Sequence, residues 1–428
     1  MRINIQFKIL GLTIGAALTI AIIALLIVMY FSKEISNKTE DELLTISKNN
    51  LKNTTANIYK SCEVANQLFN SILIRKMSVA EDIIKKSGGI NLSNQYTNIQ
   101  AVNQFSLDSK EIKIQLMRIG TSVININEDF NKYQPIIDDL KENNYTFTIF
   151  QRINEQGDML RIATNVKNNN GKRAVGTYIP YINPDGKTNS VLSKILSGEK
   201  YIGTAFVVND YYQSIYTPFR DVTGRIIGML YAGVSLKESN KLHQSVLETV
   251  VGKAGYSYVL GATGARKGYY IISKGSQNLN KSILDLKDSK GYLYIENLIE
   301  QAIESEEEQI SFFNYEDIDN YNNNPPEMLS AIAYFKPFDW IIVSAARVDE
   351  IEESSTNLRN GFFKIIIIFF VALTLVLVAV FFVGLSVSKR ISQPITESAT
   401  IMNEIAKGKI NNALVKLDEL NRWYSKQS

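Results

Sequence analysis

Two long uncharged apolar stretches stand out in the hydrophobic pattern of this sequence. Ile9 to Phe31 and Ile365 to Ser388 each have about 23 residues, the length that a helix needs to cross a bilayer. A signal peptide is the alternative for the first stretch, but its apolar region is typically only about 7 to 15 residues long. A buried soluble helix is the alternative for the second, but a surface that is apolar on every side suits lipid better. We predict transmembrane helices at residues 9–31 and 365–388.

Basic residues flank both stretches on the sides that face the chain ends. Arg2 and Lys8 precede the first stretch, and Lys389 and Arg390 follow the second. The positive-inside rule then places both termini in the cytoplasm, including the short segment 1–8, and the long middle region outside. We expect a multi-pass protein of the inner (plasma) membrane whose central region is extracytoplasmic.

A long stretch from Ser32 to about Lys86 holds neither Pro nor Gly and predicts one helix, which Gly88-Gly89 ends. Apolar residues recur along it every seven positions, which is the pattern of a buried helix seam. The recurring residues are Leu44, Leu51, Ile58, Ala65, Ile72 and Val79. The seam packs either on the chain's own domain alone or also in a parallel homodimer, and the pattern leaves both open.

Beyond this helix the pattern changes to short β-branched and aromatic runs separated by turn residues, which predicts antiparallel strands. The first group of strands is expected at Tyr145–Gln151, Met159–Thr164, Val175–Ile179, Tyr201–Val208, Gln213–Thr217 and Ile226–Val234. A helix at Lys237–Val251, which contains His243, precedes the second group. That group is expected at Tyr256–Leu260, Tyr269–Ser273, Gln309–Phe313, Leu329–Phe335 and Trp340–Ala346. The fold class is therefore α+β, with sheet modules at residues 87–236 and 237–349 carried by the helix at 32–86.

Composition narrows the function classes. The formal net charge of +3 is spread along the chain without a basic block, so we expect no nucleic-acid partner. Cys62 and His243 are the only residues of their kinds, which leaves no internal disulfide and no ready zinc site. No Gly-x-Ser-x-Gly motif occurs either. We predict neither a cofactor nor an enzyme activity, and a membrane-anchored extracytoplasmic enzyme is the weakest alternative.

Several runs resemble the fused Cache 3/Cache 2 sensor region of bacterial chemoreceptors. The matching runs are Phe150–Val166, Gly171–Ile179, Tyr201–Phe206, Tyr212, Tyr216–Asp221 and Gly228–Val234. The resemblance covers roughly Leu51 to Asp349. It implies tandem PAS-like modules stacked away from the membrane on a long N-terminal helix, and it implies extracellular sensing of a small molecule.

The segment after the second apolar stretch resembles the start of a HAMP relay. Arg390-Ile-Ser-Gln-Pro-Ile-Thr-Glu carries the resemblance. A helical apolar stripe follows Pro394 and ends at Gly408, and its members are Ile395, Ala399, Met402 and Ala406. Ile410 to Leu417 is expected as a connector and Asp418 as the start of the second helix, although Asn421 stands where the family has Gly. We expect residues 389–428 to be an incomplete HAMP domain, in a chain truncated before its signalling domain.

Candidate ligand-binding residues come from the first sheet module. Arg152 and Arg161 would be costly in an apolar pocket unless paired, which suggests anchors for a carboxylate or another anion. Strand alternation places Arg152 on the same face of its strand as Phe150. It places Arg161 on the same face of the next strand as Met159 and Ala163. Tyr178, Tyr201, Tyr212 and Tyr216 are candidates for the pocket walls, and Asp221 for holding an amine. The alternatives are surface cations, ordinary core tyrosines and turn capping by Asp221.

Some amino-acid-sensing Cache domains carry an Arg-x-Trp-Tyr run with a later Tyr and Asp. This chain resembles that run only in part, because Asn209 stands in place of the Arg and Tyr211 in place of the Trp. The ligand therefore stays open between an organic acid and an uncharged metabolite. We predict that it binds the first, membrane-distal module, where Arg161 and Tyr212 hold it.

The leading hypothesis is a homodimeric methyl-accepting chemotaxis protein. It would relay ligand binding through the second transmembrane helix and HAMP to cytoplasmic signalling machinery, by a domain beyond this chain. The sensory half of a histidine kinase or of a diguanylate cyclase is the alternative.

Overall fold

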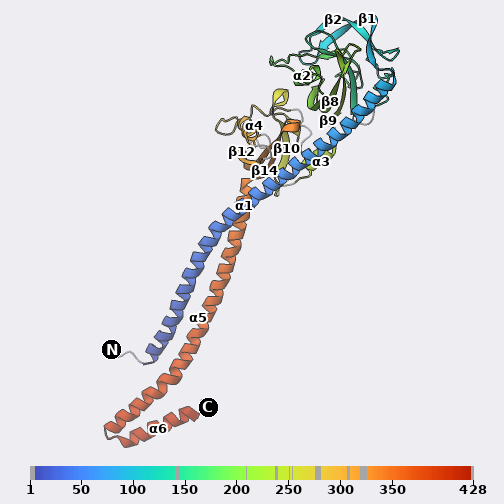
Figure 1. Cartoon of the computed structure of the whole chain (residues 1–428). Coiled ribbons are helices and arrows are strands. Elements are labelled where there is room, and N and C mark those ends of the chain that lie inside the picture. Colours follow the sequence, from blue (N-terminus) through green and yellow to red (C-terminus); the bar gives the residue numbers. More distant parts are fainter. Residues whose placement is uncertain are drawn as a thin grey trace. The chain divides into compact units, whose positions relative to one another are not determined.

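The computed structural model describes residues 5–140, 145–208, 210–236, 240–249, 251–252, 254–274, 281–305, 309–318 and 325–425. These residues form two compact units, one at Ser47–Asp349 and the other made of Met1–Ile46 with Glu350–Ser428 (Figure 1). The position of Asn209 and the first residues of the helix expected from Lys237 lie outside the described residues.

A sheet of nine strands occupies the first part of the Ser47–Asp349 unit. Its strand order is β3-β2-β1-β6-β5-β4-β9-β8-β7, and every neighbouring pair is antiparallel except β1 with β6. The strands are β1 (Ile90–Asn103), β2 (Ser109–Ile119), β3 (Ser122–Val123), β4 (Tyr145–Arg152), β5 (Met159–Thr164), β6 (Thr177–Ile179), β7 (Tyr201–Val207), β8 (Asp210–Arg220) and β9 (Ile226–Ser235). All six strands expected between Tyr145 and Val234 are present. The long hairpin β1–β2 was not predicted.

A second sheet of five strands follows in the same unit, with the order β11-β10-β14-β13-β12 and antiparallel neighbours throughout. Its strands are β10 (Tyr256–Gly261), β11 (Tyr270–Ile272), β12 (Ser311–Glu316), β13 (Glu327–Phe335) and β14 (Trp340–Arg347). Each matches an expected strand within a few residues. Short helices accompany the sheets, namely α2 (Ser190–Leu196), α3 (Asn240–Leu247), α4 (Tyr294–Glu304), η1 (Gly264–Arg266) and η3 (Lys336–Phe338).

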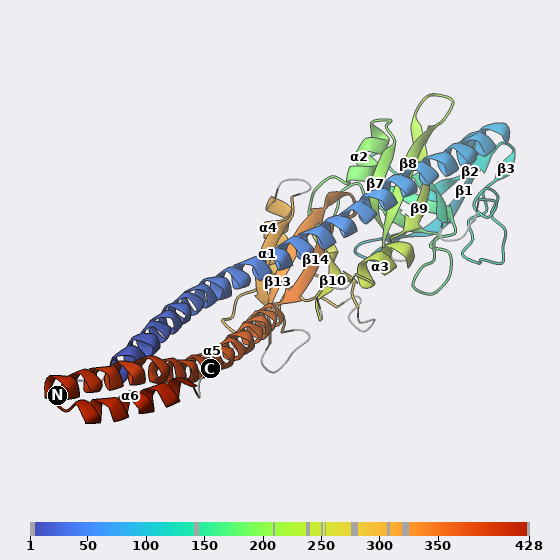
Figure 2. The same ribbon diagram turned by 90° about the horizontal axis from the view of Figure 1, so that it is seen from below.

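Helix α1 (Ile5–Lys86) contributes to the core of both sheets (Figure 2). Ile58 and Cys62 pack with residues of the five-stranded sheet and α3, while Leu73 and Met77 pack with the nine-stranded sheet. The opposite face of the nine-stranded sheet packs on α2, and the opposite face of the five-stranded sheet packs on α4. Each sheet therefore buries both faces.

The predicted seven-residue seam of α1 is only partly correct. Leu51 and Ile58 are buried, but Leu44 is 37% exposed and Val79 is 46% exposed. The residues that are buried farther along are Cys62, Leu73, Met77, Ala80 and Ile84. Their spacing follows the 3.6-residue turn of a straight helix, and a strict seven-residue repeat drifts from that line by about 20° per heptad. By Val79 the predicted seam has rotated into solvent.

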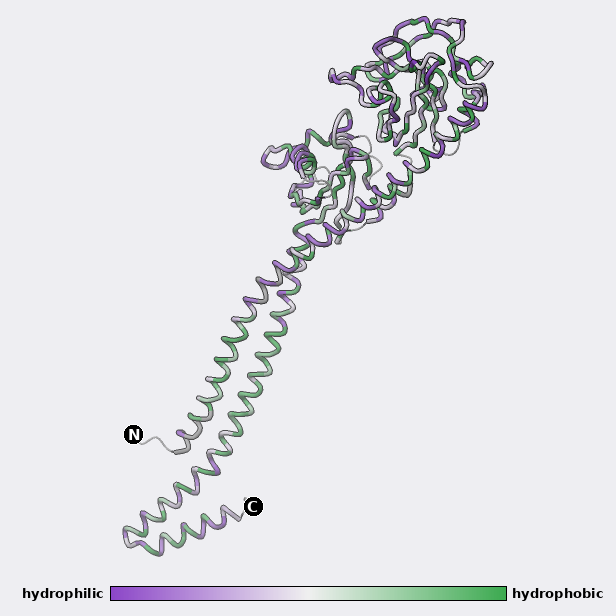
Figure 3. The backbone as a smooth tube through the Cα atoms, viewed as in Figure 1, coloured by the Kyte–Doolittle hydropathy of each residue, from purple (hydrophilic) through white to green (hydrophobic). Residues whose placement is uncertain are grey.

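The other unit contains α5 (Val348–Ala406) and α6 (Ile410–Ser425). Ile14–Glu34 and α5 are long and apolar enough to cross a membrane, and both appear as hydrophobic stretches in Figure 3. The helix passes Pro394 without interruption and ends before Gly408, whose φ of 73° is left-handed. The end at Gly408 confirms the expected stop.

The expected start of the second helix in the last 40 residues is wrong. The expected connector Ile410–Leu417 is helical, and Asp418 lies inside α6 instead of starting a helix. The expected apolar stripe is helical, but Ile395 and Met402 are exposed in this chain, and Ile401 is the residue of α5 that packs with Ala413 and Leu420 of α6. The turn at Gly408 lets α6 bury its own apolar residues against α5, and that contact could not be read from one helix alone.

Candidate ligand site

A cavity of about 550 Å³ lies at the α2 face of the nine-stranded sheet; we call it the first cavity. Its walls come from strands β7 and β8, the segment before α2, the turn after β1 and the 3-10 helix η1. The lining residues are Gln104, Phe105, Ile179, Asn183, Pro184, Asp185, Asn189, Ser190, Val191, Thr204, Ala205, Phe206, Tyr211, Tyr216, Gly264 and Ala265. The volume suits a small organic molecule.

Aromatic rings from three segments meet in the wall of this cavity. Phe105 stacks on Phe206 with ring centroids 5.8 Å apart, and Phe206 meets Tyr211 edge to face at 5.5 Å. The edge-to-face geometry is one that aromatic quadrupoles favour. These rings offer an apolar surface to the carbon skeleton of a ligand.

Tyr216 connects the cavity to a buried cation. Its ring lines the cavity and packs 4.9 Å from the ring of Tyr231. Both tyrosines interact electrostatically with the guanidinium of Arg161, which itself has no exposed surface. Burial raises the pKa of the Tyr216 hydroxyl and of the Tyr231 hydroxyl, so both stay neutral donors at physiological pH.

Arg161 lies in this core with too few partners. Its Nη1 donates to the hydroxyl of Thr177, and the guanidinium sits 4.9 Å from the centre of the Phe150 ring. Nε and Nη2 are buried and have no hydrogen-bond partner among the described residues. Desolvation lowers the pKa of Arg161 to about 10, although the neighbouring tyrosines oppose this shift. The side chain is still charged at neutral pH and is incompletely compensated.

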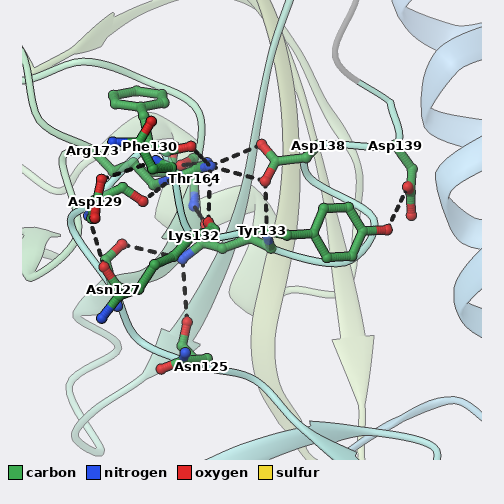
Figure 4. A network of polar contacts seen from close by, with 12 residues as sticks. Asn125, Asn127, Asp129, Phe130, Lys132, Tyr133, Asp138, Asp139, Thr164 and Arg173 are labelled. Carbon is green, nitrogen blue, oxygen red and sulfur yellow. Dashed lines mark hydrogen bonds and ion pairs between the residues drawn. The ribbon is translucent and has the colours of Figure 1, made fainter.

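Arg173 provides the contrast within the same sheet region. Its side chain is 1% exposed, and both carboxylate oxygens of Asp138 accept from its Nη2, at 3.0 and 2.9 Å (Figure 4). Its Nη1 donates to the carbonyl of Thr164, and the ring of Phe130 lies 4.6 Å from the guanidinium. Arg173 is therefore a satisfied structural cation. The unpaired nitrogens of Arg161 are not a general property of buried arginines here.

Four of the seven predicted site residues come together. Arg161, Tyr201, Tyr212 and Tyr216 all belong to the core on the α2 face, where Tyr212 also interacts electrostatically with Arg161. Tyr201 donates its hydroxyl proton to the carbonyl of Thr204 at 2.8 Å. Burial raises the pKa of Tyr201.

The other three predicted residues lie elsewhere. Tyr178 packs in the core on the α1 face of the sheet. Arg152 and Asp221 line a separate cavity of about 240 Å³. Arg152 donates to the carbonyls of Asn154 and Glu155, and Asp221 accepts from the hydroxyl of Thr223, which lowers the pKa of that carboxyl. Turn capping, the alternative considered for Asp221, is what its contacts show.

A bulge also alters the predicted strand faces. The register of β4 with β5 shifts between Ile149 and Phe150, so that Phe150 pairs with Arg161 and Ile149 with Ala163. Met159 shares the face of Arg161 as expected, but Ala163 packs on the α1 face. The prediction for Ala163 is wrong because an extra residue in one strand breaks the two-residue alternation.

Sequence patterns missed further residues of the site. Gln104 and Phe105 directly follow β1, which has few apolar residues and no clear alternation. Thr177 accepts a hydrogen bond from Arg161, and Tyr231 interacts with it electrostatically. Both lie in runs that resemble the Cache family, but no local pattern marks either one as a binding residue. The described part of the chain holds no group of His, Cys, Asp and Glu side chains suited to a metal ion.

The family model of the Cache 3/Cache 2 fusion domain matches residues 36–361. The periplasmic sensory domain of the Campylobacter jejuni chemoreceptor Tlp1 is 16% identical, with 74% of this chain and 98% of that one covered and a TM-score of 0.34. The sensory domain of Tlp3 from the same organism, solved with isoleucine bound, is also 16% identical, with 73% and 98% covered and a TM-score of 0.36.

A structure described as showing carboxylic acid recognition by a Cache chemosensory domain is 15% identical, with 25% of this chain and 69% of that chain covered and a TM-score of 0.22. A search of curated proteins finds no match. The family model spans most of the chain and includes both sheets and the cavity. The chain therefore belongs to the Cache 3/Cache 2 fusion domain family.

Proposed function

We propose that this chain is the sensing and membrane part of a chemoreceptor, and that it binds a small organic acid in the first cavity. The acid group would pair with Arg161, and the phenol groups of Tyr212 and Tyr216 would donate to it. The apolar body of the ligand would contact Phe105, Phe206 and Tyr211. The two long apolar helices would span the membrane and leave the cavity outside the cytoplasm.

The unpaired guanidinium of Arg161 carries the proposal. A buried charge that lacks partners destabilises the fold, and an apolar residue of similar size is often neutral or better for stability. Arg161 is therefore hard to explain by folding alone. An oxyanion that reaches it from the neighbouring cavity would supply the missing acceptor, because a guanidinium binds a carboxylate through two parallel hydrogen bonds.

Calorimetric titration of the full chain in lipid nanodiscs tests the proposal with five acids: acetate, lactate, malate, benzoate and phenylacetate. We expect at least one to bind. Arg161→Met keeps the side-chain length but removes the charge, and it should weaken that binding about 10- to 100-fold, since a charged hydrogen bond contributes roughly 1.5 to 3 kcal/mol. Tyr212→Phe should weaken it less.

Arg152→Met is the matched control, because Arg152 lines the other cavity. It should leave acid binding unchanged. If Arg161→Met does not fold, Arg161→Lys is the variant whose acid binding is compared with that of the unsubstituted chain. Binding that is equal in the parent and in both Arg161 variants, or no binding by any of the five acids, would overturn the proposal.

Signal output belongs to the same proposal. We propose a parallel homodimer through the helix at residues 44–79 and the segment at residues 394–406. Support comes from exposed apolar residues on α1, among them Val64 and Leu68. We prefer chemotaxis through a HAMP relay as the output, and a histidine kinase or a diguanylate cyclase is the alternative. Acid binding in the first cavity is compatible with each of these outputs.

A further inference from the structure

A buried amide behind the cavity wall joins strand β8 to helix α1. Gln213 is 1% exposed, and its Nε2 donates to Oδ1 of Asn66 at 3.1 Å and to Oδ1 of Asn70 at 2.7 Å. Asn66 and Asn70 are one helical turn apart on α1, and Asn70 also donates to Asn66 at 3.3 Å. Both protons of the Gln213 amide are therefore used on α1.

The oxygen of the same amide, Gln213 Oε1, accepts a hydrogen bond from one hydroxyl, that of Thr204. Thr204 Oγ1 lies 3.1 Å from Gln213 Oε1 and 2.6 Å from the carbonyl oxygen of Pro337. Both of these neighbours are acceptors, and a threonine hydroxyl has a single proton. Thr204 can satisfy Gln213 or Pro337 at one moment, but not both. The hydroxyl therefore has two arrangements of similar geometry.

The two acceptors lead toward different membrane helices. Gln213 holds α1, which continues as one helix to Ile5. Pro337 lies in η3, which is followed by β14 and then directly by α5. Thr204 itself belongs to the stretch Thr204–Phe206 of β7 that forms part of the cavity wall. The Thr204 hydroxyl, beside the cavity, therefore contacts both the residue that binds α1 and the segment that leads to α5.

A second contact joins the cavity wall to the five-stranded sheet. Arg266 of η1 forms an ion pair with Asp210 at the start of β8, with an N–O distance of 2.9 Å, and neither side chain is more than 21% exposed. Its neighbours Gly264 and Ala265 line the cavity. A displacement of the cavity wall would therefore move residues that contact the five-stranded sheet as well as residues that contact α1.

We infer that Thr204 and Gln213 form the junction through which occupation of the first cavity is transmitted to α1 and α5. The inference rests on the proposed function for its trigger. A ligand that displaces residues 204–206 of β7 changes which acceptor receives the Thr204 proton. When Gln213 loses the proton, its Oε1 becomes a buried unpaired acceptor, and this cost favours one packing of α1 over another. The carbonyl of Pro337 is exposed, so its bond to Thr204 holds η3 beside β7 without a comparable burial cost.

Hydrogen exchange of the full chain in nanodiscs tests the junction without any ligand. Thr204→Val removes the shared proton, and it should speed amide exchange about fivefold around Asn66–Asn70 and to a smaller extent around Phe338–Ile342, since the proton is shared between the buried Gln213 and the exposed carbonyl of Pro337. Thr204→Ser should restore the parent rates. Thr217→Val is the matched control, because the Thr217 hydroxyl is buried on β8 without a partner among the described residues. It should leave both regions unchanged.

The five acids then test the trigger. In the parent, the acid that binds should alter exchange in α2 and around Asn66–Asn70. In Gln213→Met the change in α2 should persist and the change in α1 should vanish. Faster exchange confined to β7 and β8 in Thr204→Val, or an undiminished α1 response in Gln213→Met, would overturn the junction. If no acid changes α2, the proposed function fails while the ligand-free comparison still decides the junction.

Discussion

Two fully buried arginines lie near each other in the sequence and differ in what surrounds them. Arg173 reaches Asp138 and three backbone carbonyls of the segment before β4, and a fourth at the end of β5. Arg161 has one hydroxyl and one aromatic ring. The first arrangement stabilises the fold, and the second leaves two donor nitrogens without an acceptor among the described residues. Only the partners, not the residue type, separate the structural role from the proposed binding role.

Substitution of each arginine by methionine should separate these roles in stability. Arg173→Met leaves the carboxylate of Asp138 without its cationic partner and should lower the free energy of unfolding by roughly 3 to 5 kcal/mol. Arg161→Met removes a poorly compensated charge and should leave the free energy within about 1 kcal/mol of the parent value. Urea denaturation of both variants in the same detergent or nanodisc provides the measurement. A larger loss for Arg161→Met than for Arg173→Met would assign Arg161 a structural role.

Each element shows how packing modifies local periodicity. Helix α1 keeps its 3.6-residue turn because it packs on two sheets of its own chain, so the seven-residue seam drifts off the buried line. In the five-stranded sheet, tyrosines of β10, β12 and α4 gather in one core. The Tyr258 hydroxyl donates to that of Tyr315 at 3.3 Å, and the Tyr294 ring stacks on Tyr315 at 5.3 Å.

These buried tyrosines should make the five-stranded sheet sensitive to alkali. Desolvation raises the pKa of Tyr258 and of Tyr315 well above the ordinary value of 10.0. The unfolded chain therefore loses these protons first, and the stability that is present below pH 10 is lost as pH rises above it. We expect the free energy of unfolding to fall by up to about 1.4 kcal/mol per pH unit for each such tyrosine.

Tyr258→Phe should reduce this slope, because one ionisable group is removed. The exposed Tyr96 offers the control, and Tyr96→Phe should leave the slope unchanged. Urea denaturation between neutral pH and about pH 11 measures the slope, and tyrosinate absorbance reports ionisation. A slope that Tyr258→Phe does not alter would contradict the expected origin of the alkaline instability.

The whole molecule combines a two-sheet sensor unit with two helices that are long and apolar enough to cross a membrane. The placement of the sensor unit outside the cytoplasm stays a prediction from flanking charges. The native thiol simplifies a test, since Cys62 is buried and desolvation raises its pKa to about 12. Such a thiol reacts slowly with maleimides, because the thiolate is the nucleophile.

Labelling of intact cells with a membrane-impermeant maleimide tests the topology. Val222 is 92% exposed in the turn between β8 and β9, and Leu414 is 58% exposed in α6. Val222→Cys should be labelled on intact cells, whereas Leu414→Cys should be labelled only after permeabilisation. The parent chain should stay unlabelled in both conditions. The reverse order of accessibility would place the sensor unit in the cytoplasm.

Local chemistry was enough for much of this protein. The sequence alone determined the two apolar helices, since a span needs only about 20 apolar residues in a row. It also determined eleven strands, whose β-branched and aromatic runs and turn residues are local signals, and the family resemblance. It pointed to Arg161 because a cation between apolar strand residues is costly wherever it lies.

Tertiary structure decided the rest, because those features depend on residues distant in the chain. The hairpin β1–β2 lacks an apolar alternation and is placed by pairing with β6 and packing on α1. The bulge at Ile162 of β5 determined the face of Ala163, and a helix follows the turn at Gly408 where a connector was expected. Whether a buried arginine is satisfied depends on partners that only folding brings near: Arg173 meets a carboxylate 35 residues away, and Arg161 meets none.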